Sequence, residues 1–143
     1  MTSEQTPQAQ INELVMQISQ LEARGEQLEK QYETLSSYLA EMDATSTTLE
    51  GLGKSEVGTE ILVPVGSSSW IRATVMDIKE VIIGLGAQVS AVKSIADAQK
   101  TIQDRMKDVQ NALRQTGEQL EQIRVYIENM RNELQNFANQ AQG

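Results

Sequence analysis

The sequence predicts a mainly α fold, in which two long helices form an antiparallel coiled coil and are joined by two β-hairpins. Apolar residues follow a heptad spacing near both ends of the chain, whereas the middle alternates apolar residues with Gly- and Ser-containing turns. One Phe, one Trp and three Tyr among 143 residues are too few to fill a thick globular core. The predicted divisions are a coiled-coil helix over 8–50, two hairpins over 51–92 and a second coiled-coil helix over 93–141.

The first helix carries one narrow apolar seam with alternating steps of three and four residues. Its positions are Ile11, Leu14, Ile18, Leu21, Gly25, Leu28, Tyr32, Leu35, Leu39, Met42, Ser46 and Leu49. Thr6 followed by Pro7 predicts an N-cap and a first helical residue. Gly25 has no side chain to pack in the seam and lowers helix stability by about 1 kcal/mol, so it is a weak point where the helix could bend. The hydroxyl-rich run 45–48 predicts fraying or an end near Leu49.

The last helix carries a second seam of similar length. Its positions are Ile95, Gln99, Ile102, Met106, Val109, Leu113, Thr116, Leu120, Ile123, Ile127, Met130, Leu134, Phe137 and Ala141. Two seams of equal length joined by a compact middle predict an antiparallel pair, with Ile11 near Phe137 and Leu49 near Ile95. Both ends of the chain are then expected at one distal tip.

The middle segment predicts four short strands, at 60–65, 70–76, 81–85 and 88–92. Pro64 cannot donate a backbone hydrogen bond, so it is expected at an edge or a strand end. Hairpins of this size are marginal alone, and pairing with the same region of other subunits is expected to complete a β-barrel platform. The expected oligomerisation residues are Ile61, Val63, Val65, Trp70, Ile71, Val81, Ile83 and Leu85.

Composition argues against several functions. The chain has no His and no Cys, which removes the commonest general base, metal ligand and thiol nucleophile, so we expect no catalytic residues, metal or cofactor. A formal charge of -8 disfavours nucleic acid as a partner. The absence of a long apolar run and the polar start predict a cytoplasmic protein without membrane contact.

Two nucleotide-like motifs are weak. Gly84-Leu85-Gly86 lacks the third glycine of a dinucleotide fingerprint and reads better as a hairpin turn. The run 51–55 ends in Gly-Lys-Ser, but Thr48 stands where a phosphate-binding loop has its first glycine, and a helix precedes the run. We therefore do not expect an enzyme.

The middle segment also carries a family resemblance. The runs TEILVPVGSSSWIRATV and KEVIIGLGAQVSAVK, placed between two long coiled-coil segments, resemble an archaeal-type alpha subunit of prefoldin. Two hairpins fit the alpha class, because beta-type subunits carry one. The resemblance implies that the chain is part of an ATP-independent holdase. It also implies that this holdase is a hexamer of two such chains with four beta-type subunits. It also implies that unfolded protein is held between free coiled-coil tips and delivered to a cytosolic chaperonin.

The tip residues are the candidate client-binding surface. Val15 and Met16 lie off the seam, and methionine suits a surface that accepts many partners. The full set is Ile11, Leu14, Val15, Met16, Met130, Leu134 and Phe137. Seam packing within the chain is an open alternative for several of these residues. A structural or tethering coiled-coil adaptor with one defined partner is the alternative function.

Overall fold

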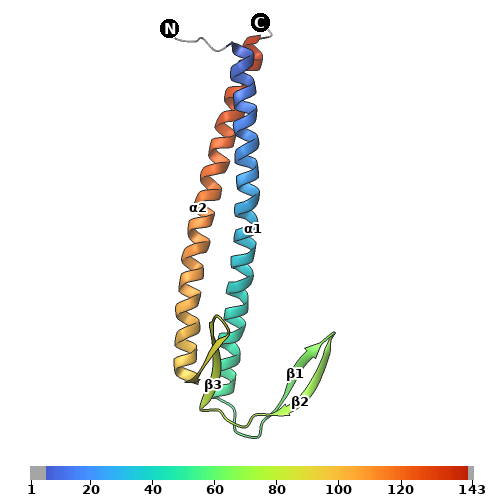
Figure 1. The fold of residues 1–143 in the computed structure, drawn as a ribbon, viewed down its shortest axis with the longest axis vertical. Helices are drawn as coiled ribbons and strands as arrows, with labels where there is room; N and C mark the ends of the chain where they lie inside the picture. The colour runs from blue at the N-terminus through green and yellow to red at the C-terminus, as the bar shows by residue number, and fades with distance from the viewer. Residues whose placement is uncertain (1–5, 142–143) are drawn as a thin grey trace. The chain divides into compact units, whose positions relative to one another are not determined.

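The computed structural model describes residues 6–141, and Figure 1 shows the order of its elements. The elements are α1 (Pro7–Gly53), β1 (Glu60–Gly66), β2 (Ser69–Thr74), β3 (Glu80–Gly86), β4 (Val89–Ser94) and α2 (Ile95–Ala141). The predicted plan of helix, two hairpins and helix is confirmed. The chain divides into two compact units: one joins α1 up to residue 37 with α2 from residue 110, and the other comprises 38–109.

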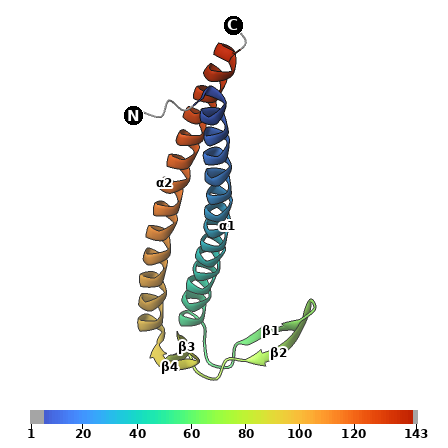
Figure 2. The ribbon, with the colours of Figure 1, turned by 45° about the horizontal axis from the view of Figure 1, so that its top comes forward.

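In the first unit, the two helices run side by side in opposite directions (Figures 1 and 2). The start of α1 is capped as predicted, since the hydroxyl of Thr6 accepts a hydrogen bond from the backbone N–H of Ala9 at 3.3 Å. Ile18 and Leu28 are buried against the facing helix, and Leu28 is only 2% exposed. A heptad seam therefore holds this unit together.

The seam prediction is confirmed along both helices. Every predicted position from Ile11 to Leu49 is at least partly buried, except Tyr32, which is 41% exposed. On α2, every predicted position from Ile95 to Phe137 is at least partly buried. Ala141 lies outside the residues whose side chains are described. A seam with so few lapses indicates that residue spacing alone set the relative rotation of the helices.

In the second unit, one hairpin packs on the helix ends. Leu49, Ile83, Ala98 and Ile102 form a buried cluster, with side chains from both helices and from β3. Met42, Val81, Ile95 and Met106 pack around this cluster while partly exposed. Ile95 thus lies beside the cluster that contains Leu49, as the antiparallel pairing predicted.

The end of α1 differs from the prediction of fraying near Leu49. The helix continues to Gly53, and the hydroxyls of Thr45, Thr47 and Thr48 donate to the backbone carbonyls one turn earlier, at 2.9 to 3.1 Å. These bonds keep threonine compatible with helix, and Leu49 is anchored in the cluster.

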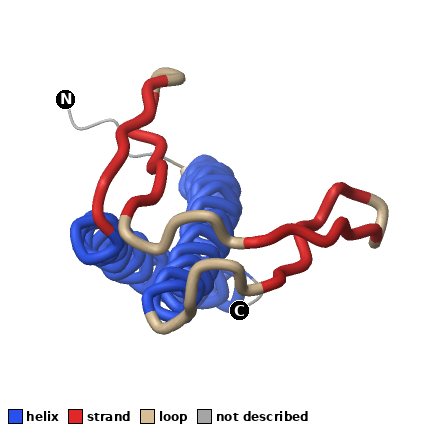
Figure 3. The backbone as a smooth tube through the Cα atoms, turned by 90° about the horizontal axis from the view of Figure 1, so that it is seen from below, coloured by secondary structure: helices blue, strands red, loops and turns tan. Residues whose placement is uncertain are grey.

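The hairpins are two separate two-stranded antiparallel sheets, drawn in red in Figure 3. Their registers match when twenty is added to each residue number, so Glu60 faces Thr74 as Glu80 faces Ser94. Each register shifts just before the turn, after Pro64 in one hairpin and after Gly84 in the other. Every strand has a free edge, so Pro64 lies at an edge as predicted. The single chain closes no barrel within the described residues.

The turns also share one geometry. Ser67 and Ser68 have positive φ angles of 47° and 57°, and their counterparts Ala87 and Gln88 have 49° and 63°. Two consecutive residues of this kind form the turn that matches the twist of a hairpin. The observed strand ends differ from the predicted ones by one or two residues.

Candidate functional site

At the end of the first unit where α1 begins and α2 ends, apolar side chains lie among polar ones. A hollow of about 270 Å³ is lined by Leu14, Met130 and Phe137 together with polar neighbours, so residues from the two ends of the chain meet there. Val15 and Met16 are 51% and 63% exposed, although both are large and apolar. The remaining predicted tip residues, Ile11 and Leu134, are half-buried in the seam.

The hairpins carry the second group of exposed apolar side chains. Five of the eight predicted oligomerisation residues are exposed, and these are Ile61, Val65, Trp70, Ile71 and Leu85. Val63 is half-buried. Val81 and Ile83 instead pack on the helices of their own chain, and Ile83 is 8% exposed. The structure therefore gives these two residues an intramolecular role.

Several other exposed apolar residues of the hairpin region lie outside the predicted set. They are Leu62 on β1, Met76 in the segment after β2, Ile82 on β3, and Val89 and Val92 on β4. A signal was present, because Ile61-Leu62-Val63 and Val81-Ile82-Ile83 are continuous apolar runs. Continuous runs are typical of strands that are covered on both faces, whereas alternation marks a strand with one wet face.

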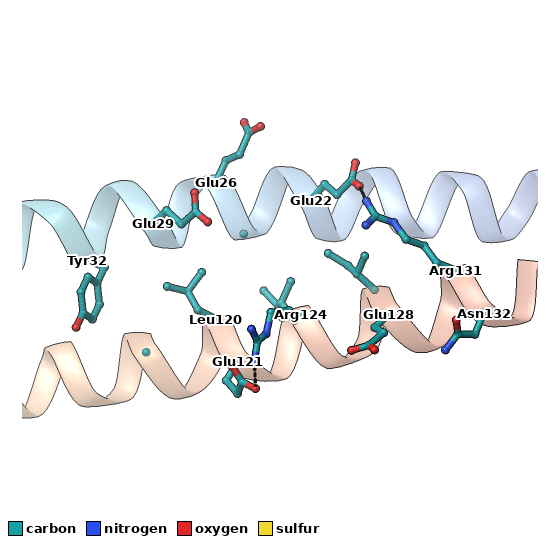
Figure 4. A pocket seen from close by; sticks show the side chains of 14 residues that line it. Glu22, Glu26, Glu29, Tyr32, Leu120, Glu121, Arg124, Glu128, Arg131 and Asn132 are labelled. Carbon is teal, nitrogen blue, oxygen red and sulfur yellow. Dashed lines mark hydrogen bonds and ion pairs between the residues drawn. The ribbon is translucent and has the colours of Figure 1, made fainter.

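A longer groove opens midway along the first unit, and Figure 4 shows its side chains. Its volume is about 880 Å³. Leu120, Ile123 and Ile127 of α2 supply its apolar part, and they are half-buried. Residues of α1 that line it include Gly25 and Tyr32.

Charged side chains surround the groove. Arg131 pairs with Glu22 across the two helices, and Arg124 pairs with Glu121 along α2 at 2.6 Å. Arg124 donates a hydrogen bond to the carboxylate of Glu121, and this bond, followed by the negative charge of Glu121, raises the pKa of Arg124 above its ordinary value. Both pairs are solvent-exposed, so their contribution to stability is small.

The Gly-Lys-Ser run is occupied by local bonds. Lys54 pairs with Glu50 at 3.0 Å, and the hydroxyl of Ser55 donates to the carbonyl of Gly51 at 2.8 Å. These contacts complete the C-terminal end of α1. Over residues 6–141 no cluster of acidic side chains has the composition to hold a metal ion. In the same stretch, neither helix is long and apolar enough to cross a membrane.

Comparison with known proteins gives the family. The family model for prefoldin subunits matches residues 21–140, and it spans most of both helices and both hairpins. A likeness that covers the helices together with both hairpins is specific, because coiled coil alone is common. The chain belongs to the prefoldin family.

Curated relatives that match the chain are alpha subunits of prefoldin. The chain is 32% identical over 96 residues to prefoldin subunit alpha from Methanopyrus kandleri, a match that covers 67% of this chain and 61% of the relative. It is 41% identical over 88 residues to prefoldin subunit alpha from Methanococcus aeolicus, covering 59% of each. The chain thus spans about three-fifths of the curated relatives it matches. The predicted resemblance to archaeal alpha subunits is confirmed.

A solved structure supports the fold. A chain in the cryo-EM structure of filamentous PFD from Methanocaldococcus jannaschii superposes with a TM-score of 0.71 at 24% identity. The match covers 82% of this chain and 98% of that chain.

Proposed function

We propose that this chain is a subunit of an ATP-independent holdase, which binds unfolded polypeptide at its coiled-coil tip. Membership of the prefoldin family and resemblance to alpha subunits support this role. In the proposed assembly, two copies of the chain combine with four beta-type subunits. The complex acts in the cytoplasm and delivers its clients to a cytosolic chaperonin.

The exposed apolar surface of the hairpins is the observation that carries the assembly part of the proposal. Trp70 is 56% exposed and Ile71 is 52% exposed, on strands that have free edges. Free edges and apolar faces are liabilities unless another chain covers them. We therefore assign Ile61, Val65, Trp70, Ile71 and Leu85 to contacts with other subunits, and Val63 to the rim of that surface.

The exposed residues of the tip carry the client-binding part. Val15 and Met16 face solvent beside a hollow lined by Met130 and Phe137. Thioether and aliphatic side chains adapt to many apolar partners, which suits a protein that binds clients without a shared sequence. No nucleotide hydrolysis enters this cycle.

Native mass spectrometry tests the assembly. When this chain is co-expressed with a beta-type prefoldin subunit from the same source, we expect a complex of two copies of this chain with four copies of the beta-type subunit. A homodimer that ignores this subunit would instead support an adaptor, in which the helices bind one defined partner.

A triple variant tests the tip. Replacing Val15, Met16 and Phe137 with Ser is expected to weaken suppression of client aggregation several-fold while the oligomer keeps its mass, because Val15 and Met16 are exposed and Phe137 is only half-buried near the end of the seam. A matched control replaces exposed Val125 and Tyr126, which lie on α2 away from the tip, and should leave suppression unchanged. Equal loss in both variants would contradict the tip assignment.

A further inference from the structure

Two glycines that line the groove of the first unit face large side chains of the opposite helix. A methyl group on Gly25 would lie 3.7 Å from Ile123, and one on Gly117 would lie 3.7 Å from Tyr32. Neither glycine has a side chain, so Ile123 and Tyr32 pack close to the backbone of the opposite helix. Tyr32 occupies a seam position but is 41% exposed. The apolar seam is therefore accessible here.

The side chains around this opening have an uneven charge. Five carboxylates and two guanidinium groups line the groove, which gives a net formal charge of -3. Both arginines are already paired, with Glu22 and Glu121. Glu26, Glu29 and Glu128 form no ion pair within the described residues. In Figure 4, Glu26 points away from α2, and the carboxylate of Glu29 lies beside α1.

We propose that this groove binds an extended segment of non-native polypeptide in which lysine or arginine stands next to apolar residues. The inference rests on the proposed holdase function and adds a second, charge-selective contact to the tip. Leu120, Ile123 and Ile127 take the apolar side chains, and Glu29 and Glu128 take the basic ones. A volume of about 880 Å³ lies within the range of protein pockets that bind ligands, roughly 300–1,000 Å³.

Charge also argues against a second copy of this chain as the occupant. The chain has a formal charge of -8, so the acidic groove repels it on approach. A basic segment is attracted instead, and an apolar segment without charge gains only the contact with the groove floor. The order of affinity for short peptides should therefore be basic-apolar, neutral-apolar and acidic-apolar.

The test uses the oligomer that the full chain forms and fluorescein-labelled twelve-residue peptides. One peptide has Leu and Lys separated by Ser, a second has Glu in place of Lys, and a third has Ser in place of Leu. We expect the Leu–Lys peptide to bind most tightly. The double substitution Glu29→Gln and Glu128→Gln should weaken it about fivefold, as expected for two exposed charge pairs.

The matched control is Glu33→Gln with Glu41→Gln, which removes the same charge from exposed positions outside the groove. It should change the affinity by less than twofold. Equal weakening by both double variants would overturn the inference, because general attraction to an acidic protein would then explain the binding. Equal binding of the peptide without Leu would also overturn it. A change in oligomer mass with the groove variant would assign the groove to subunit contact and overturn it as well.

Failure of this inference is separable from failure of the proposed function. If wild-type protein suppresses client aggregation but the groove variant binds the Leu–Lys peptide as wild type does, only the groove inference fails. If wild-type protein suppresses no aggregation, yet the groove variant selectively loses peptide binding, the holdase role fails and the groove remains a peptide site.

Discussion

The two hairpins share a backbone design but differ in what covers them. Residues at equivalent positions, such as Val63 and Ile83, occupy the same place in identical registers. Ile83 is 8% exposed in a cluster with Ala98 and Ile102, whereas Val63 is only half-buried. One chain thus uses the same structural unit twice, since the second hairpin packs on the helices and the first leaves its apolar side chains exposed.

The largest expected effect separates these two roles. Ile83→Asp places a carboxylate in the apolar cluster and should lower the free energy of unfolding of the isolated chain by more than about 3 kcal/mol. Val63→Asp should lower it by less than about 1 kcal/mol and mainly prevent assembly with other subunits. Denaturant unfolding followed by circular dichroism measures the first effect, and native mass spectrometry measures the second. If both substitutions destabilised the isolated chain equally, the two hairpins would not differ in how they are packed.

The turn glycines give the next largest effect. Gly66 and Gly86 have φ angles of 109° and 98°, which residues with a side chain rarely adopt. Alanine at either position should cost about 1–2 kcal/mol in local strain. Gly86→Ala should therefore speed amide hydrogen exchange in β3 and β4 alone, and Gly66→Ala in β1 and β2 alone. Exchange that spreads from one hairpin to the other would show that they do not open independently.

Arg105 of α2 forms a hydrogen bond with the second hairpin only. Its guanidinium donates to the carbonyl of Gly84 at 2.7 Å. Arg105→Gln should reduce protection of β3 and β4 by about 1 kcal/mol, measured by hydrogen exchange, and leave β1 and β2 unchanged. Lys107→Gln, at an exposed position on the same helix, is the matched control. A similar loss of protection in the control would argue against a specific tie.

The smallest effect concerns the first hairpin. Arg72 lies 3.6 Å from Glu60, and both side chains are mostly exposed. Glu60→Gln should change the free energy of unfolding by less than about 0.5 kcal/mol, and addition of salt should remove the difference. Thermal unfolding at low and high ionic strength measures both values. A larger decrease in the free energy of unfolding that persists at high salt would indicate that this pair stabilises the hairpin despite its exposure.

Much of the fold was predictable, because heptad spacing is a direct physical signal. Leu28 and Leu49 are buried where the seam placed them. The sequence did not distinguish Val63 from Ile83, since both end the same kind of apolar run and only the contacts of Ile83 with α1 and α2 separate them. The groove was also missed. Gly25 was recognised as a weak point, but Gly117 lies off the predicted seam, and their common effect depends on how the two helices align.

The single tryptophan has a practical consequence. Trp70 is the only indole in the chain, and it lies more than half exposed on β2, opposite Pro64. Indole emission moves to shorter wavelength when the ring leaves water. The chain therefore carries its own fluorescent reporter on the first hairpin, which contributes no residue to the cluster of Leu49, Ile83, Ala98 and Ile102. Stopped-flow mixing with a tryptophan-free subunit would then follow assembly in real time without a label. Clients without tryptophan that bind at the tip would leave this signal unchanged.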